Sequence, residues 1–277
     1  MEYIEMICHP SQGAHTAELL MAMLADTGFE SFTENENGTL SAFMQAPLFT
    51  PELSKRISSD EFVEFLDSFT IERIADQNWN AVWESQYESV LIDNRCMVRA
   101  PFHQPQTGVE FDIVIMPKMS FGTAHHETTK LMIQYLLSMQ LNGKSLLDMG
   151  SGTAVLAILA RMKNAGPVTA IDNDEWAFNN AIENVESNNY GDIEVLLGDS
   201  SSLAGRKFDV VLANINRNIL LADIPEYRKC LTNDGKLIVS GFYLNDLPMI
   251  EAKANEVGLS IMSSRTENNW TSACFTI

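Results

Sequence analysis

The stretch that most restricts the fold of this chain is LLDMGSGTAVLAILA, residues 146–160. It has the pattern of a buried strand, a turn containing Gly150 and Gly152, and an apolar helix. Four more strands are predicted, at 168–172, 193–199, 208–215 and 235–242, with helices that begin near Thr153, Asp174, Asn216 and Asn245. Strands that alternate with helices form a doubly wound, mostly parallel α/β sheet. Such a sheet binds its ligand at the carboxyl ends of its strands.

The segments on either side of this alternation are also strand-like. Residues 96–102 and 111–117 precede it, and residues 259–270 and 271–277 follow it without a helix between them. Two successive strands with no crossover helix pair antiparallel. We therefore expect the sheet to end in an antiparallel hairpin.

The first third of the chain predicts a separate small domain. Strand patterns occur at 3–8, 29–34, 38–45 and 69–75, and helical patterns at 13–30 and 51–69. The order β-α-β-β-α-β is typical of a ferredoxin-like α+β fold. Trp79, Trp83 and Tyr87 then recur every fourth residue, which indicates one aromatic stripe on a helix. We predict an N-terminal recognition domain at 1–76, a linker helix at 77–94 and a catalytic domain at 95–277.

The charge distribution bears on partners. The net charge is −19, and residues 1–90 hold 16 acidic against 3 basic residues. Such a protein is a poor direct binder of nucleic acid. The acidic first third is either a solubilising surface or a docking surface for a basic protein, and the sequence leaves both open.

Cellular location is inferred from what the sequence lacks. No apolar run approaches the roughly 20 residues of a membrane span, and the first residues do not resemble a signal peptide. The four cysteines, Cys8, Cys96, Cys230 and Cys274, are scattered without a CxxC pair. This spacing favours a reducing cytoplasm and gives no indication of a zinc site.

The glycine loop is compatible with two kinds of cofactor. A nicotinamide dinucleotide requires G-x-G-x-x-G, and Val155 stands in the place of the third glycine. The spacing is nearer to G-x-G-x-G, with Ala154 last, which is compatible with S-adenosylmethionine. Gly150 and Gly152 would let the backbone approach the ligand.

Polar residues follow the next three strands. Asp172 is placed to accept hydrogen bonds from ribose hydroxyls, Asp199 lies beside the same pocket near adenine, and Asn214 ends the fourth strand. Each is also a residue type that commonly caps a helix or turn.

The stretch FGTAHHETT, residues 121–129, precedes this region. A metal site is not expected, because adjacent histidines on an extended segment point to opposite faces. No oxyanion-hole motif accompanies Thr128 or Thr129. We therefore interpret the stretch as a clamp in which Gly122 folds over the cofactor and Thr129 hydrogen-bonds it. His125 and His126 either shape a channel for the substrate or cap the following helix.

Together, FGTAHHETT, LLDMGSGT, the ANI at 213–215, NWNAVWESQY at 78–87 and ENNW at 267–270 resemble the bacterial ribosomal protein L-eleven methyltransferases. The resemblance implies a class I fold with a seven-stranded sheet and S-adenosyl-L-methionine as cofactor. It also implies methylation of amino groups, on lysine side chains or the N-terminus, of a large-subunit ribosomal protein. Family cofactor contacts fall on Thr129, Gly150, Asp172 and Asn214. Ala124 and Ala154 depart from the family's usual glycines.

Methyl transfer requires a neutral amine, and an amide oxygen can orient one without favouring the ammonium ion. We therefore predict Asn214 as the catalytic residue. We also expect the enzyme to be a monomer. Two alternatives remain: a methyltransferase for another protein or a small amine, and a nucleotide-binding module without transferase activity.

Overall fold

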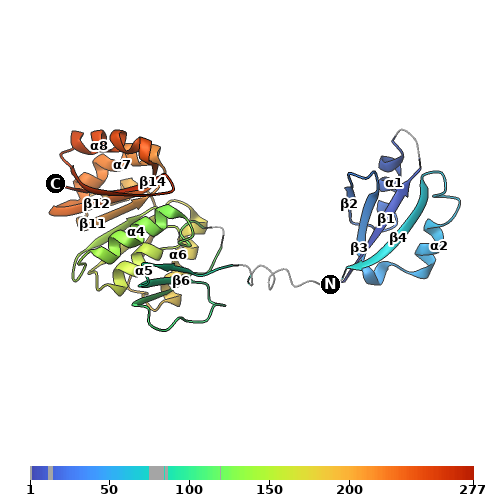
Figure 1. Ribbon diagram of the computed structural model, residues 1–277, viewed down its shortest axis with the longest axis horizontal. Helices are drawn as coiled ribbons and strands as arrows, with labels where there is room; N and C mark the ends of the chain where they lie inside the picture. Colours follow the sequence, from blue (N-terminus) through green and yellow to red (C-terminus); the bar gives the residue numbers. More distant parts are fainter. Residues whose placement is uncertain (1, 12–14, 75–83, 85–86, 119) are drawn as a thin grey trace. The chain divides into compact units, whose positions relative to one another are not determined.

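A computed structural model describes residues 2–11, 15–74, 84, 87–118 and 120–277. The chain separates into two compact units, residues 1–86 and residues 87–277, each of which is described by itself (Figure 1). Among the helices in these ranges, none has the length and apolar character needed to cross a membrane.

The first unit is a four-stranded antiparallel sheet with order β2-β3-β1-β4. Its elements are β1 (Tyr3–Pro10), α1 (Thr16–Ala25), β2 (Ser31–Glu34), β3 (Leu40–Gln45), the 3-10 turn η1 (Ala46–Leu48), α2 (Pro51–Ile57) and β4 (Leu66–Ile74). This is the predicted ferredoxin-like order: β3 lies between β2 and β1, and β1 lies between β3 and β4. One face of the sheet packs Ile4, Met6 and Met44 against Leu20 and Leu24 of α1.

The second helix of this unit is shorter than the predicted 51–69. It ends at Ile57, and the next strand already begins at Leu66. The hydroxyls of Ser58 and Ser59 donate to the carbonyls of Ser54 and Arg56. Serine side chains that bond to nearby backbone in this way compete with helix continuation.

The second unit contains the predicted seven-stranded sheet, with order β10-β9-β8-β11-β12-β14-β13. The first five strands in this order, from β10 through β9, β8 and β11 to β12, are parallel. Strand β14 is antiparallel to both β12 and β13, which confirms the closing hairpin. The strands are β8 (Leu146–Met149), β9 (Val168–Asp172), β10 (Glu194–Leu197), β11 (Phe208–Asn214), β12 (Leu231–Tyr243), β13 (Ser260–Glu267) and β14 (Trp270–Thr276). The helices are α4 (Glu127–Ser138), α5 (Val155–Met162), α6 (Glu175–Ser187), α7 (Arg217–Cys230) and α8 (Leu247–Glu256), with 3-10 turns η2 (Ser200–Leu203) and η3 (Leu244–Asp246).

The central strands of this sheet, β9, β8 and β11, are buried on both faces. Alternate residues of each strand face opposite sides. Leu146 and Leu212 thus belong to the core beneath α4, α5 and α6, whereas Leu147 and Val211 belong to the core beneath α7 and α8 (Figure 1). The chain order reverses between the neighbouring strands β8 and β11, and a ligand crevice forms at such a switch point.

A second, three-stranded sheet was only partly predicted. The two predicted strands are present as β6 (Cys96–Arg99) and β7 (Phe111–Val114). Their parallel pairing was not predicted, nor was β5 (Val90–Ile92), which also joins β6. The linker helix predicted at 77–94 therefore does not extend through Val90–Ile92, and most of its remainder lies outside the described residues. Asp93 and Asn94 adopt positive φ angles in the turn between β5 and β6. This turn makes β5 part of the second unit, so that unit begins before the predicted boundary at 95.

All four cysteines are buried free thiols. Burial raises the pKa of the Cys8 and Cys96 thiols to about 12. It also raises the pKa of Cys230 and Cys274.

Candidate functional site

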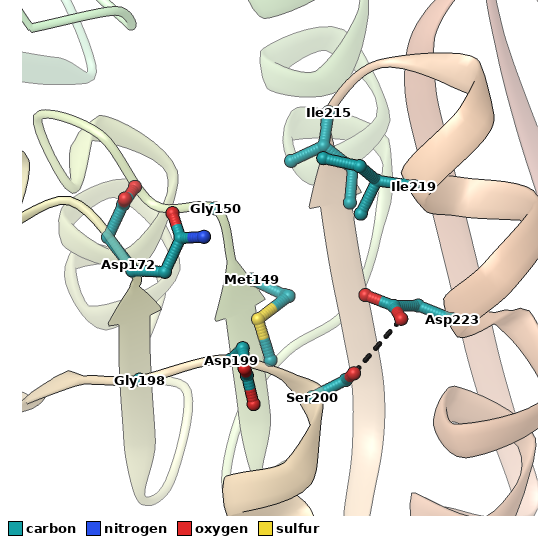
Figure 2. A pocket seen from close by; sticks show the side chains of 10 residues that line it. Met149, Gly150, Asp172, Gly198, Asp199, Ser200, Ile215, Ile219 and Asp223 are labelled. Carbon is teal, nitrogen blue, oxygen red and sulfur yellow. Dashed lines mark hydrogen bonds between the residues drawn. The ribbon is translucent and has the colours of Figure 1, made fainter.

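Three adjoining pockets lie along the carboxyl ends of β8, β9, β10 and β11. The first is lined by Met149, Gly150, Asp172, Asn173, Gly198, Asp199, Ser200, Ile215, Ile219 and Asp223 (Figure 2). The second shares Gly150, Asp172 and Ile215 with it and adds Gly152, Asn214 and Phe121. The third shares Phe121, Asn214 and Ile215 with the second. We call them the first, second and third pockets.

The glycine loop between β8 and α5 requires its two glycines. Gly150 has φ 67°, and a Cβ there would lie 2.2 Å from Ile215 Cγ2. Gly152 has φ 52°, and a Cβ there would lie 2.3 Å from the Phe121 carbonyl oxygen. Both are therefore fixed by a left-handed backbone and by close neighbours. Ala154, where the family usually has glycine, is also left-handed with φ 62°.

The two predicted acidic residues both line the first pocket. Asp172 accepts hydrogen bonds from the amides of Gly152 (2.8 Å) and Asp174 (3.0 Å), one on each carboxylate oxygen. A carboxylate offers about four acceptor sites, so acceptor capacity remains on both oxygens. Asp199 caps η2 through Oδ1, which accepts from the amide and hydroxyl of Ser201. The hydrogen bonds from Ser201 lower the pKa of the Asp199 carboxyl, which favours its ionised form.

Asn214 lies in the wall shared by the second and third pockets. Its Nδ2 donates to Thr129 Oγ1 at 3.3 Å, which fixes the direction of the amide. Its Oδ1 is buried and has no hydrogen-bond partner among the residues that the structure describes. Thr129 itself is buried in the first turn of α4 and does not line these pockets, so the structure places it behind Asn214.

The third pocket has aromatic walls. His126 stacks edge-on with Trp270 (4.7 Å between ring centroids) and with Phe121 (5.2 Å). Tyr243 packs against the other side of Trp270 at 4.2 Å. Among the described residues that line this pocket there is no carboxylate.

The clamp stretch is held against the glycine loop. Thr153 donates from its amide to the Phe121 carbonyl (3.0 Å) and from its hydroxyl to the Gly122 carbonyl (2.7 Å). The two histidines diverge, as expected for an extended segment. His125 Nε2 lies 2.9 Å from the Glu88 carbonyl oxygen, whereas His126 caps α4 through Thr128 and also lines the third pocket. The capping alternative is therefore confirmed for His126, whereas a role in shaping a channel for the substrate stays a prediction.

A buried carboxyl lies directly beneath the loop. Asp148 of β8 is 1% exposed, and its Oδ2 accepts a hydrogen bond from the Ala157 amide (3.1 Å). Burial, together with the nearby charge of Asp172, raises the pKa of the Asp148 carboxyl to about 8. The group therefore stays largely protonated near neutral pH.

Several lining residues were missed from the sequence. Phe121, Ile215, Trp270 and Asp223 all line one or more of the pockets, and Asp223 accepts a hydrogen bond from Ser200 across the first pocket (Figure 2). Ile215 follows Asn214 and Phe121 precedes Gly122, so proximity to predicted residues was the available signal. Trp270 ends the ENNW motif quoted for the resemblance, but its place at the site was not predicted, because β14 is brought there only by the closing hairpin.

Comparisons with known proteins give matches that extend over nearly the whole chain. The family model of ribosomal protein L11 methyltransferase matches residues 7–276. A ribosomal protein L11 methyltransferase of Bacteroides fragilis is 44% identical over 281 residues and covers all of both chains. One from Phocaeicola vulgatus is 42% identical over 280 residues, with 99% of each chain covered. Among solved structures, the ribosomal protein L11 methylase of Lactobacillus delbrueckii subsp. bulgaricus aligns with a TM-score of 0.64 at 26% identity, covering 69% of this chain and 97% of that one.

Proposed function

This chain belongs to the ribosomal protein L11 methyltransferase family, and from that premise we propose how its residues transfer methyl groups from S-adenosyl-L-methionine to amino groups of ribosomal protein L11. It is a methyltransferase that uses this cofactor. The amino groups are lysine side chains, the N-terminal amine, or both. The observation that carries the residue assignment is the buried, unpartnered Oδ1 of Asn214 between two pockets.

The first and second pockets fit the cofactor. When bound, S-adenosyl-L-methionine supplies a methyl group activated by a positively charged sulfur. Gly150 and Gly152 let the loop pack closely against Ile215 and Phe121, which line the same two pockets, since neither glycine carries a Cβ. Asp172 keeps acceptor capacity for ribose hydroxyls, and Asp199 lines the part of the first pocket that we assign to adenine. Thr129 contributes by holding Asn214.

Asn214 orients the amine. An amide oxygen accepts an N–H hydrogen bond without the full negative charge that would favour an ammonium ion. Leaving a buried oxygen unpaired costs on the order of 1–3 kcal/mol, which a hydrogen bond from the substrate would recover. Because Nδ2 is already engaged with Thr129, only Oδ1 is available for the amine. Catalysis then consists mainly of positioning the lone pair of the amine against the methyl carbon, and no strong base is required.

The third pocket is the approach for the amine. Its aromatic walls, Phe121, His126 and Trp270, attract an arriving ammonium ion through their ring faces. They also exclude water, and desolvation favours loss of the proton. The absence of a carboxylate among its lining residues leaves no fixed negative charge there to hold the amine protonated.

The acidic first unit docks the basic substrate. Glu5 of β1 and Glu72 of β4 are directly opposite each other, on the face of the sheet away from Met6 and the helices. Like charges in directly opposed positions destabilise a sheet. A basic side chain of the partner that lies between them would relieve this repulsion. We further propose that the enzyme acts as a monomer in the cytoplasm, in keeping with its four free thiols.

Mass spectrometry of purified ribosomal protein L11, after incubation with the enzyme and isotopically labelled cofactor, tests the function. The expected result is labelled methyl groups on amino nitrogens of this protein. Other basic ribosomal proteins and free lysine serve as controls. Preferential labelling of one of these controls, or cofactor binding without any transfer, would support one of the alternative functions instead.

A further inference from the structure

Thr153 joins the two segments that border the second pocket. Through its amide and hydroxyl it holds the carbonyls of Phe121 and Gly122, and it directly follows Gly152 in the glycine loop. Its side chain is fully buried. The position of Thr153 therefore sets both the loop and the clamp.

Asn184 on α6 holds Thr153 from behind. Its Nδ2 donates to the Thr153 carbonyl (3.1 Å), and its Oδ1 accepts from the amide of Met116, beyond the end of β7 (2.9 Å). The side chain is 0% exposed and lines none of the three pockets. One amide group thus fixes the glycine loop relative to the chain that leads from β7 toward the clamp.

Asn188 is its structural counterpart one helical turn later. It is also buried, accepts from the Val114 amide (2.9 Å), and donates to the carbonyls of Val114 and Asn184 (both 2.7 Å). None of these partners belongs to the glycine loop or the clamp. Asn184 lies in α6 and Asn188 is the C-cap residue of the same helix; they are 0% and 9% exposed. Both hold the segment around β7, but only Asn184 hydrogen-bonds Thr153.

We infer that Asn184 is a positioning residue for cofactor binding, acting through Thr153 on the glycine loop and the clamp. The inference rests on the assignment of the second pocket to S-adenosyl-L-methionine. Without the Asn184 amide, the Thr153 carbonyl loses its buried partner, and the loop and clamp are free to shift. The cost appears as lost cofactor affinity in addition to lost stability, because a loop that must be ordered on binding lowers the apparent affinity.

The test compares Asn184→Ala with Asn188→Ala in the full-length chain. Urea unfolding measures stability, and calorimetry measures the dissociation constants of S-adenosyl-L-methionine and S-adenosylhomocysteine. We expect both variants to lose similar stability, whereas only Asn184→Ala raises both dissociation constants, by about tenfold, with Asn188→Ala within twofold of wild type. Equal effects of the two variants on affinity, or no effect of Asn184→Ala, would overturn the inference.

A second variant covers poor folding of Asn184→Ala. Thr153→Val keeps the Asn184 contact and the Thr153 amide but removes the hydroxyl that holds Gly122. We expect it to weaken cofactor binding as well, and the double variant with Asn184→Ala to fall short of the product of the two single effects, since both act on one unit. If the effects of the two substitutions on the dissociation constant multiplied fully in the double variant, Asn184 and Thr153 would not act through one shared unit. Failure of wild type to bind the cofactor would instead refute the pocket assignment itself.

Discussion

At the residue scale, the site is organised around one amide and one carboxyl. The Asn214 amide has a fixed donor and a free acceptor, so its orientation is set before any substrate arrives. The Asp148 carboxyl lies under the glycine loop, fully enclosed. Both groups are buried because Asp148 and Asn214 lie at or near the carboxyl ends of strands in the core of the unit.

Asn214→Ala should lower kcat by about 100-fold and change the cofactor dissociation constant less than threefold, because it removes an orienting contact to the amine. Asn214→Asp should also be impaired near neutral pH and recover partly at higher pH, since a carboxylate favours the ammonium form. Steady-state kinetics over pH 6–10, with calorimetry of the cofactor, measures both. Full activity of Asn214→Ala with unchanged cofactor affinity would remove the proposed role.

Asp148→Asn should flatten the dependence of stability on pH. The folded pKa of about 8 lies above the ordinary 3.8, so the contribution of this group is fully present below about pH 4 and is lost as pH rises towards 8. In that window wild type should lose about 1.4 kcal/mol per pH unit relative to the variant. Urea unfolding at pH 5, 6, 7 and 8 measures the difference. Parallel curves for the two proteins would show that Asp148 is ionised in the folded state.

At the element scale, the sequence predicted the parallel strands and the hairpin well, because strand and helix periodicities alternate cleanly there. It missed β5, a strand of three residues that lies within the range 77–94 predicted for the linker helix. For the site, Gly150, Asp172, Asp199 and Asn214 could be predicted because parallel strands deliver their carboxyl ends to one edge. The aromatic walls could not be predicted, because they depend on how β14 and the clamp pack in three dimensions.

The glycine loop continues into α5 through Ala154, whose left-handed backbone suits glycine. Ala154→Gly should relieve strain of roughly 1 kcal/mol while losing a buried methyl group of similar value, so its net effect should lie within about 0.5 kcal/mol. The matched change Ala157→Gly, inside the same helix and equally buried, should cost about 2 kcal/mol, since there only losses occur. Urea unfolding of both variants compares them. Equal destabilisation would indicate that Ala154 is unstrained.

At the scale of the whole molecule, charge is divided unequally between the two units, with the excess of acids in the first. The proposed function assigns catalysis to the second unit and substrate docking to the first. In that proposal, the opposed pair Glu5 and Glu72 gives the docking surface a specific location rather than a diffuse potential.

Glu5→Lys combined with Glu72→Lys should raise KM for ribosomal protein L11 by about tenfold and leave the cofactor dissociation constant unchanged. Glu18→Lys combined with Glu64→Lys makes the same change in net charge away from this face of the sheet, and should raise KM less than threefold. Kinetics at several ionic strengths measures both pairs, because long-range attraction is screened by salt and close contacts less so. If the two pairs of substitutions raised KM equally, docking would depend on the net charge of the unit and not on Glu5 and Glu72 in particular.

The burial of every native thiol has a practical consequence. A single cysteine engineered on the exterior of each unit would be far more reactive to maleimide dyes than the four that nature placed in the interior. Fluorescence energy transfer between two such labels could then follow the separation of the units during turnover, without first removing any native sulfur.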